Sequence, residues 1–420
     1  MTGNLRDRLK RIQQKKQDVQ TAPPSQTESD GSSGKFTRGG DVSAFTAQGW
    51  SPAGYMTLRR EITSREGIEL PETLPTAAGI LMPDIGSAAY EDLLFFDLET
   101  TGLSGGAGTV AFLAAFGRLV PAGRTGPKTA RYELHITQYL LLDYPGESDF
   151  VGAILDEFNR TPAGFTMISY NGKSFDSQIL KTRCLMNGIT PPDYGHTDLL
   201  YPARRLWKRL LPNCSQGTIE TGILGIDRTG DIPGAMAPDI WFDFLRNGNT
   251  EQLLGICDHN RRDISGLAAL FASMIQIADD PLCAAEEIDF DIESLSLRWY
   301  GITRRGTDMD LHETGKRLLQ FAADSGYPRA VLRFALSLIG DEQYGRGREW
   351  LLKAAREDCP LPVRLSALRA LAIHSERRLG NTAEALGYSE QGLELLEPDS
   401  CLYHDFEHRA ERLRKKLISE

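Results

Sequence analysis

The sequence lacks several features that would place it in a membrane, secreted or zinc-ribbon class. None of its apolar runs approaches the roughly 20 residues that span a bilayer, so we expect no membrane association. The N-terminus has no apolar signal-peptide core, which argues against export. The six cysteines are scattered without a CxxC pair, which argues against a zinc ribbon and a disulfide framework. These absences together predict a protein of the reducing cytoplasm.

An excess of positive charge is also missing. The formal net charge is −10 over 420 residues. Proteins that coat nucleic acid nonspecifically depend on Lys and Arg to neutralise phosphates, so this charge argues against such a protein. An enzyme is not excluded, because a metal site needs acidic ligands and a local basic patch can still hold a strand. The 41% of hydrophobic and 25% of charged residues are ordinary for a soluble globular protein.

Changes in composition divide the chain into four parts. The N-terminal part combines a short basic helix with a Pro/Ser/Gly-rich linker, and the helix either binds a partner or anionic surface or is a frayed tail. A segment rich in Gly and Pro follows, which we expect to pack on the next domain as an extension. The predicted parts are the basic helix and linker at 1–35, the extension at 36–90, an α/β domain at 91–280 and a helical region at 281–420.

The order of elements from residue 91 indicates the fold class. Apolar runs at 93–100, 109–120 and 131–142 predict three strands, and the short turns between them favour an antiparallel meander. A helix at 147–160 and a buried strand at 165–170 follow, and further helices run to 277. Three adjacent strands followed by alternating helix and strand are the order of a ribonuclease-H-like α/β domain, a mixed sheet flanked by helices.

The region beyond residue 281 has the pattern of an all-helical structure. Residues 367–398 resemble a tetratricopeptide repeat, with a helix, a Gly-Asn turn, a second helix and Pro398. Such a repeat would pack on the enzyme or dock a protein partner. A plain helical cap without a binding role is the alternative.

Two acidic residues at the end of the first predicted strand form the sharpest motif. Asp97 and Glu99 are two residues apart, so both side chains project from the same face of the strand. Adjacent like charges repel each other, and a cation between them removes that penalty. Oxygen ligands suit Mg²⁺ or Mn²⁺. The alternative for an isolated DxE motif is a solvated end of a strand.

Two later motifs add further candidate ligands. Asp176 lies in the first turn of a predicted helix, where the helix dipole favours a negative charge, and capping that helix is its ordinary alternative role. His259 and Asp263 are four apart on another predicted helix and share one face. A surface His/Asp pair is the alternative there. Together the three motifs supply four carboxylates and one histidine.

This arrangement resembles the DEDD superfamily of 3′-5′ exonucleases, and looks closest to its YprB-like ribonuclease-H-like branch. The resemblance covers about 91–278 and rests on ETTGL after the first strand, NGKSFD before a helix and HNRRD late in the domain. One departure concerns the histidine. In the usual histidine-type enzymes it lies five residues before the last aspartate, whereas His259 lies four before Asp263, the spacing of the tyrosine-type branch.

The resemblance implies a two-metal nuclease mechanism on the ends of single-stranded DNA or RNA. Two ions, Mg²⁺ or Mn²⁺, would clamp the scissile phosphate. Asp97 would bridge the ions, and Glu99, Asp176 and Asp263 would complete their shells. His259 would orient or deprotonate the attacking water, although its spacing leaves the role of base open.

Substrate-binding residues are expected around the same motifs and on a basic helix. Thr100, Thr101, Gly102 and Leu103 would lie against the terminal nucleotide, with Asn171 and Phe175 in the same cleft. The predicted helix at 199–211 carries Arg204, Arg205 and Lys208 with Trp207, a combination that can hold a single strand by phosphate contact and stacking. The alternative is a solvated helix face with Trp207 in the core.

Three functions are therefore considered. The leading hypothesis is a 3′-5′ exonuclease. The second is an endonuclease or a hydrolase of short nucleotides. The third is a noncatalytic scaffold that docks partners through its helical tail, against which the presence of all four carboxylates counts.

Overall fold

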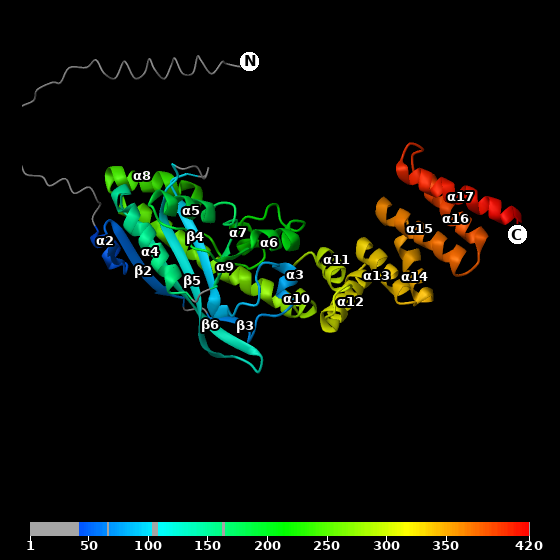
Figure 1. Ribbon diagram of the computed structural model, residues 1–420, viewed down its shortest axis with the longest axis horizontal. Coiled ribbons are helices and arrows are strands. Elements are labelled where there is room, and N and C mark those ends of the chain that lie inside the picture. Colours follow the sequence, from blue (N-terminus) through cyan, green and yellow to red (C-terminus); the bar gives the residue numbers. More distant parts are fainter. Residues whose placement is uncertain (1–41, 65–66, 103–107, 162–163, 420) are drawn as a thin grey trace, which may run out of the picture. The chain divides into compact units, whose positions relative to one another are not determined.

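A computed structural model of the chain describes residues 42–64, 67–102, 108–161 and 164–419. The predicted basic helix and linker at 1–35 lie outside the described residues. Within the described part, eight strands form one mixed sheet that is flanked by helices, and an all-helical region follows (Figure 1). This architecture confirms the predicted ribonuclease-H-like α/β fold and helical C-terminal region.

The centre of the sheet is the predicted meander. Strands β4 (Leu93–Thr100), β5 (Ala111–Arg124) and β6 (Thr129–Leu141) pair in antiparallel order. Asp97 lies opposite Ala115, and Ala115 lies opposite Gln138. The meander therefore places Asp97 two strands away from Gln138 on β6, and Gln138 belongs to the hydrogen-bond chain of the site described below.

Further strands extend both edges of the meander. The short strands β7 (Thr166–Ser169) and β8 (Gly195–Asp198) add parallel to β4. The predicted extension supplies β1 (Ser51–Gly54), β2 (Thr57–Thr63) and β3 (Ile68–Pro71), and both β2 and β3 pair with β6. The strand order is β1-β2-β6-β5-β4-β7-β8. The segment before residue 91 is thus part of the sheet itself.

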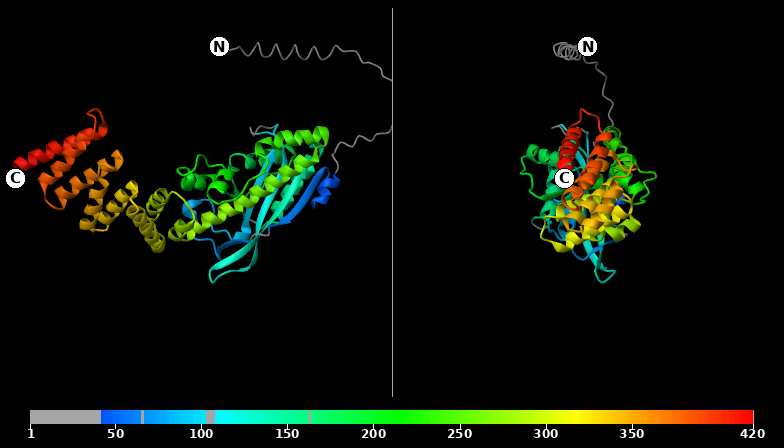
Figure 2. Two further views of the ribbon diagram at one scale, coloured as in Figure 1. Left: turned by 180° about the vertical axis from the view of Figure 1, so that it is seen from behind. Right: turned by 90° about the vertical axis from the view of Figure 1, so that its right-hand side faces the viewer.

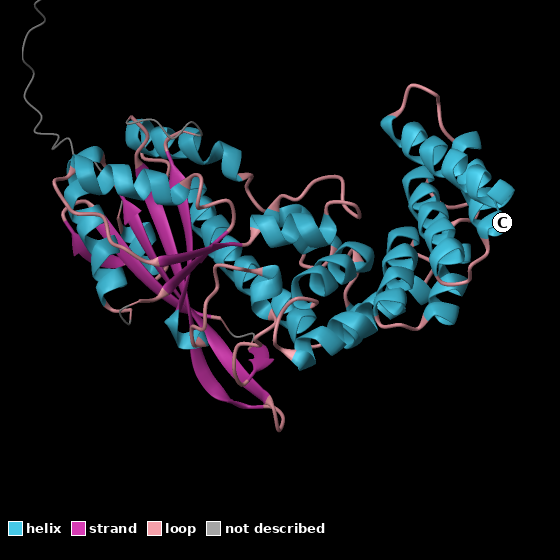
Figure 3. Cartoon of the chain, turned by 45° about the vertical axis from the view of Figure 1, so that its right-hand side comes forward, coloured by secondary structure: helices cyan, strands magenta, loops and turns pink. Residues whose placement is uncertain are grey.

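The helices alternate with these strands and then continue alone (Figure 3). The predicted helix that carries Asp176 in its first turn begins at Asp176 itself, because residues 171–175 form a turn before it. Helices up to the end of the sheet region are α2 (Ser43–Ala47), α3 (Ala78–Leu81), α4 (Glu147–Asn159), α5 (Asp176–Met186), α6 (Leu200–Trp207), α7 (Gln216–Gly222), α8 (Ala237–Asn247), α9 (Thr250–Asp279) and α10 (Pro281–Glu287). The C-terminal helices are α11 (Ile292–Thr303), α12 (Met309–Asp324), α13 (Pro328–Gly340), α14 (Tyr344–Ala354), α15 (Leu361–Arg377), α16 (Thr382–Glu394) and α17 (Cys401–Ser419).

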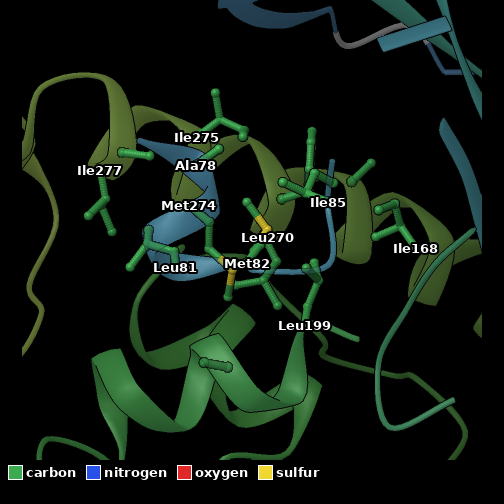
Figure 4. Close-up of a cluster of buried hydrophobic side chains, with 14 of the residues drawn as sticks. Ala78, Leu81, Met82, Ile85, Ile168, Leu199, Leu270, Met274, Ile275 and Ile277 are labelled. Carbon is green, nitrogen blue, oxygen red and sulfur yellow. The ribbon is translucent and has the colours of Figure 1, made fainter. Parts of the chain in front are cut away.

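Each face of the sheet has its own hydrophobic core. Successive side chains of a strand point to opposite faces, so Phe95 packs against Phe271 of α9 while Phe96 stacks on Phe116. Figure 4 shows part of the first core, where side chains of α3 and α9 meet Ile168 of β7 and Leu199. Asp97 and Glu99 follow Phe95 by two and four residues, so their side chains project from the same face of β4 as Phe95, towards α9.

Helix α9 lies close against the sheet, where it contacts β3, β4, β5 and β6 (Figure 2). Gly117 of β5 permits this approach. A Cβ atom at this position would come within 2.7 Å of Ile264 Cγ2 and 3.2 Å of Phe95 Cβ. The absence of a side chain there lets α9 bring its polar residues onto the end of β4.

The C-terminal helices form further apolar clusters and contact the sheet region through α11. Arg298 of α11 donates a hydrogen bond to the carbonyl of Ile80, and Arg209 forms ion pairs with Asp291 and Glu293. None of the described helices combines the length and apolar character required to cross a membrane.

Candidate active site at the end of strand β4

A cavity of about 240 Å³ lies where β4, α5 and α9 meet. All five side chains predicted to be catalytic line this cavity, although they come from three distant stretches of the sequence. The lining residues are Asp97, Leu98, Glu99, Thr100, Tyr170, Asn171, Phe175, Asp176, Gly234, Pro238, His259 and Asp263.

Strand β4 contributes Asp97 and Glu99. The four residues before Asp97 are fully buried, so the strand is anchored in both cores. Glu99 is only 8% exposed although it carries a carboxylate. The pairing register of β4 and β5 shifts between Glu99 and Thr100, which ends the regular ladder at the cavity. The strand therefore holds two carboxylates rigidly at its irregular end.

Asp176 enters the cavity from the first turn of α5. The preceding turn contains Asn171 at a positive φ of 63°. The buried carboxylate of Asp198 fixes this turn, because its Oδ1 accepts from the backbone N–H of Asn171 at 2.8 Å and its Oδ2 accepts from that of Lys173 at 3.1 Å. Asp198 thus supports the turn, whereas the neighbouring His196 contacts Ser169 and Ser177, and neither residue lines the cavity.

Helix α9 contributes His259 and Asp263. Their spacing of four residues places them on one face, as predicted, and His259 Nε2 lies 3.3 Å from Asp263 Oδ2. The same nitrogen lies 3.9 Å from Glu99 Oε1. One potential ligand atom from each of Glu99, His259 and Asp263 falls within 4.8 Å of the others.

A buried chain of hydrogen bonds positions Asp97. The guanidinium of Arg60 donates to Gln138 Oε1, with the shorter distance 2.6 Å. Since a guanidinium only donates, Gln138 must present its amide nitrogen on the other side, where it donates to Asn260 Oδ1 at 2.9 Å. Asn260 Nδ2 then donates to Asp97 Oδ2 at 2.7 Å. Arg60 on β2 thereby sets the orientation of a carboxylate on β4.

Sequence reasoning did not identify Asn260 or Gln138, although a signal was present. Asn260 is fully buried and interrupts the apolar stripe formed by Ile256, Ile264 and Leu267 on α9. Gln138 is also fully buried and interrupts the apolar face of β6. A buried polar side chain needs a hydrogen-bond partner. The two polar residues at apolar positions could therefore have been predicted to bond to each other.

Sequence reasoning also missed a second group, Arg228 and Asp231, from the segment between α7 and α8. Arg228 donates to Asp231 Oδ2 at 2.7 Å and to Asp263 Oδ1 at 2.6 Å. It also donates to the fully buried Glu220 at 2.5 Å. Asp231 Oδ2 in turn lies 3.0 Å from His259 Nδ1. No local pattern marks this segment as part of a site, because its residues act only after the chain folds back onto α9.

Burial and mutual repulsion raise the pKa values of the clustered carboxyl groups. Burial raises the pKa of Asp97 and Glu99 well above the usual range, and the charges of Asp263 and Asp176 raise both further. Burial and the charge of Asp198 raise the pKa of Asp176 to about 7. Among the described residues, no Lys or Arg forms an ion pair with Asp97, Glu99 or Asp176. Their negative charges therefore converge without a compensating cationic side chain.

This donor set fits divalent cations. Carboxylate oxygens are the ligands that Mg²⁺ and Mn²⁺ prefer, and a cation would relieve the repulsion that raises these pKa values. RNase H-like folds typically use divalent metals, and Glu99, His259 and Asp263 form a cluster able to hold one. The buried carboxylates thus match the metal chemistry that the fold implies.

The predicted substrate-binding residues divide between the cavity and its surroundings. Thr100, Asn171 and Phe175 line the cavity. Thr101 and Gly102 follow β4 directly, and Thr101 Oγ1 accepts from the backbone of Val110 at 3.0 Å. Leu103 lies outside the described residues.

The predicted basic helix is α6, and its residues lie outside the cavity lining. Trp207 is fully buried and donates to the carbonyl of Asp289, so it belongs to the core and is not free to stack on a base. Arg204, Arg205 and Lys208 are exposed. Burial raises the pKa of the cavity-lining Tyr170, and the nearby charge of Arg204 offsets part of this rise. Arg205 donates to the carbonyl of Leu81.

Comparisons with known proteins identify the family of the chain. The model of the RNase_H superfamily matches residues 94–275, a range that includes all five predicted catalytic residues. The "Uncharacterized protein YprB" of Bacillus subtilis (strain 168) is 31% identical over 312 residues, which cover 72% of this chain and 69% of the relative. The chain therefore belongs to the YprB family within the RNase_H superfamily.

Proposed function

We propose that the chain is a metal-dependent nuclease, specifically a 3′-5′ exonuclease that hydrolyses phosphodiester bonds of single-stranded DNA or RNA. Membership of the RNase_H superfamily and the acidic cluster support nuclease activity. The observation that carries the proposal is the convergence of Asp97, Glu99, Asp176 and Asp263 on one cavity. A structural role would not require four acidic side chains at one place when, among the described residues, Asp263 alone of the four pairs with an Arg or Lys, namely Arg228.

In this mechanism Asp97, Glu99, Asp176 and Asp263 would hold the two ions, Mg²⁺ or Mn²⁺. Two such ions would activate a water for attack on the phosphorus and stabilise the leaving 3′ oxygen. The protein's contribution is preorganisation. The hydrogen bond from Asn260 fixes Asp97, the buried β4 fixes Glu99, and the turn held by Asp198 fixes Asp176, so little reorganisation is needed when the substrate arrives.

The substrate strand would enter beside β4 and α6. The end of β4 and the residues that follow it would contact the terminal nucleotide, with Leu103 against its base, and Asn171 and Phe175 would line the same cleft. Exposed Arg204 and Lys208 would contact phosphates farther along the strand, while Arg205 is already engaged with Leu81. The residues assigned to the terminal nucleotide are Thr100, Thr101, Gly102 and Leu103.

The cellular setting is part of the same proposal. All six cysteines are free thiols, which is compatible with action in the reducing cytoplasm. The C-terminal helices would dock a protein partner, as the tetratricopeptide-like segment at 367–398 predicts.

A nuclease assay tests the proposal. The purified full-length chain should shorten single-stranded DNA or RNA labelled at its 5′ end, one nucleotide at a time, when Mn²⁺ or Mg²⁺ is present. Asp97→Ala and Asp263→Ala should abolish the shortening. Asp258→Ala is the matched control, because Asp258 lies on α9 but pairs with Arg261 and Arg262 instead of lining the cavity.

Other outcomes discriminate between the candidate functions. Cleavage of a circular single strand would identify an endonuclease and overturn the exonuclease assignment. Shortening of strands blocked at the 3′ end would reverse the polarity. Absence of metal-dependent hydrolysis on both DNA and RNA would favour the noncatalytic scaffold, for which Asp97→Ala should leave biological function intact.

A further inference from the structure

The two ring nitrogens of His259 face different groups. Nδ1 lies 3.0 Å from Asp231 Oδ2, and Nε2 points into the acidic cluster formed by Glu99 and Asp263. An ionised carboxylate can only accept a hydrogen bond, so the contact with Asp231 places a proton on Nδ1. In the neutral ring, Nε2 then carries a lone pair that faces the oxygens of two carboxylates.

Asp231 is held beside the imidazole ring by a cationic side chain. Arg228 donates to Asp231 Oδ2 at 2.7 Å, and the same oxygen lies 3.0 Å from His259 Nδ1. Arg228 is itself anchored by Glu220, which is fully buried on α7. The link from α7 through Arg228 to Asp231 therefore fixes the orientation of the imidazole ring.

Arg228 also orients Asp263. It donates to Oδ1 of Asp263 at 2.6 Å, which leaves Oδ2 turned towards His259 Nε2 at 3.3 Å. A lone pair on nitrogen and a carboxylate oxygen at that distance repel each other unless a proton or a cation lies between them. His259 Nε2 stands 3.3 Å from Asp263 Oδ2 and 3.9 Å from Glu99 Oε1, and both distances fit ligands that each stand about 2.1 Å from a common ion.

We propose that His259 is a direct ligand, through Nε2, of the divalent cation held by Glu99 and Asp263, and that Asp231 is its positioning residue. A metal-binding histidine commonly donates its other ring N–H to a carboxylate, which fixes the tautomer and the ring orientation. This inference rests on the proposed metal-dependent function and changes the role of His259 from base to ligand.

The ligand set has a consequence for metal preference. Mg²⁺ favours oxygen ligands and retains waters, whereas first-row transition metals accept an imidazole nitrogen readily. A site composed of two carboxylates and one imidazole should therefore bind Mn²⁺ more tightly than Mg²⁺. Replacing the imidazole by an oxygen ligand should reduce this difference.

Electron spin echo envelope modulation of the Mn²⁺-loaded full-length protein tests the proposal directly, because it detects nitrogen nuclei bound to the metal. The wild-type protein should show ¹⁴N coupling, which changes to the ¹⁵N pattern when histidine is labelled. His259→Gln should bind Mn²⁺ without nitrogen coupling. His196→Gln is the matched control and should keep the coupling, because His196 lies between Ser169 and Ser177 outside the cavity.

Mn²⁺ affinity measured by calorimetry tests the positioning role of Asp231 separately. Asp231→Asn retains the imidazole but loses the fixed tautomer, and it should weaken Mn²⁺ binding by about 10- to 100-fold in calorimetry. Circular dichroism of each variant establishes that it is folded. Mn²⁺ affinity unchanged in Asp231→Asn would overturn the positioning role.

The outcomes separate this inference from the proposed function. Stoichiometric Mn²⁺ binding and nuclease activity without ¹⁴N coupling would overturn the ligand role of His259 and leave the nuclease intact. Clear ¹⁴N coupling in a protein that hydrolyses no nucleic acid would support the ligand role and overturn the nuclease. A protein that binds no Mn²⁺ would overturn both.

Discussion

Acidic side chains are arranged differently in the sheet region and in the C-terminal helices. Around the end of β4, Asp97, Glu99 and Asp176 converge with raised pKa values, and none of them forms an ion pair with a Lys or Arg in the part of the chain that the structure describes. In the helices, acidic residues face basic ones. Glu384 contacts Arg348 at 2.6 Å, and its pKa is lowered by hydrogen bonds from Ser375 and Arg348.

This difference separates side chains that bind a ligand from side chains that stabilise the fold. Opposite charges at the surface contribute modestly to stability and need nothing else. Buried like charges oppose folding until a cation neutralises them, so their presence indicates a site whose function outweighs its cost in stability. The following predictions test this contrast.

The largest effect is expected for Asp97→Asn. The substitution removes one of the converging charges but keeps an oxygen to accept from Asn260. Activity should fall on the order of 10³-fold, equal to about 4 kcal/mol of transition-state stabilisation. The melting temperature of the metal-free protein should stay the same or rise, because a desolvated charge is lost. A large fall in melting temperature instead would identify Asp97 as structural.

A smaller loss of activity is expected for Asn260→Leu. The variant removes the donor to Asp97 and leaves the fully buried amide of Gln138 without one of its acceptors. We expect activity to fall by about 10- to 100-fold, as for other residues that orient a metal ligand. The free energy of unfolding should fall by about 1–3 kcal/mol in urea titrations. Full activity in the folded variant would contradict the positioning role of this hydrogen-bond chain.

The response to metal should depend on pH. The pKa of Asp176 is raised to about 7 in the folded protein, so the metal-free fold loses stability as the pH rises from about 4 to about 7 and this carboxylate ionises. Protons compete with the metal for Asp176 below about pH 7, where this carboxyl group is protonated in the folded protein. The rise in melting temperature caused by Mn²⁺ should therefore be larger at about pH 8 than at about pH 5.5, and Asp176→Asn should reduce the difference. A rise that is equal at both pH values would contradict the account.

The smallest effect is expected in the helical region. Glu384→Gln weakens the contacts with Arg348 and Ser375 and should lower the free energy of unfolding by about 1 kcal/mol. Nuclease activity per folded molecule and Mn²⁺ affinity should not change. A loss of metal binding in this variant would contradict the claim that acidic residues of the C-terminal helices stabilise the fold and do not contribute to the metal site.

Local patterns were sufficient for the central fold and for the four carboxylates and the histidine that line the cavity. The apolar run before Asp97 predicted a buried strand, and the spacing of two placed Asp97 and Glu99 on one face. The spacing of four placed His259 beside Asp263, which the distance of 3.3 Å confirms. These features depend on the period of a single strand or helix, so the sequence carries them without knowledge of the fold.

Contacts between distant segments were not predictable in the same way. Strand β1 is exposed along its whole length, and β8 has only four residues, so neither has the alternating pattern of a half-buried strand. Both are fixed by pairing with β2 and β7. The partners Arg228 and Asp231 were missed for the same reason, since only the return of the chain onto α9 gives them a role.

The most direct test of the account is an anomalous difference map from a crystal of the protein soaked in Mn²⁺. The account predicts two peaks in the cavity at the end of β4, one of them bound by Glu99, His259 Nε2 and Asp263, and the other near Asp97 and Asp176. A saturating soak that leaves this cavity without a peak while Mn²⁺ binds elsewhere would contradict it.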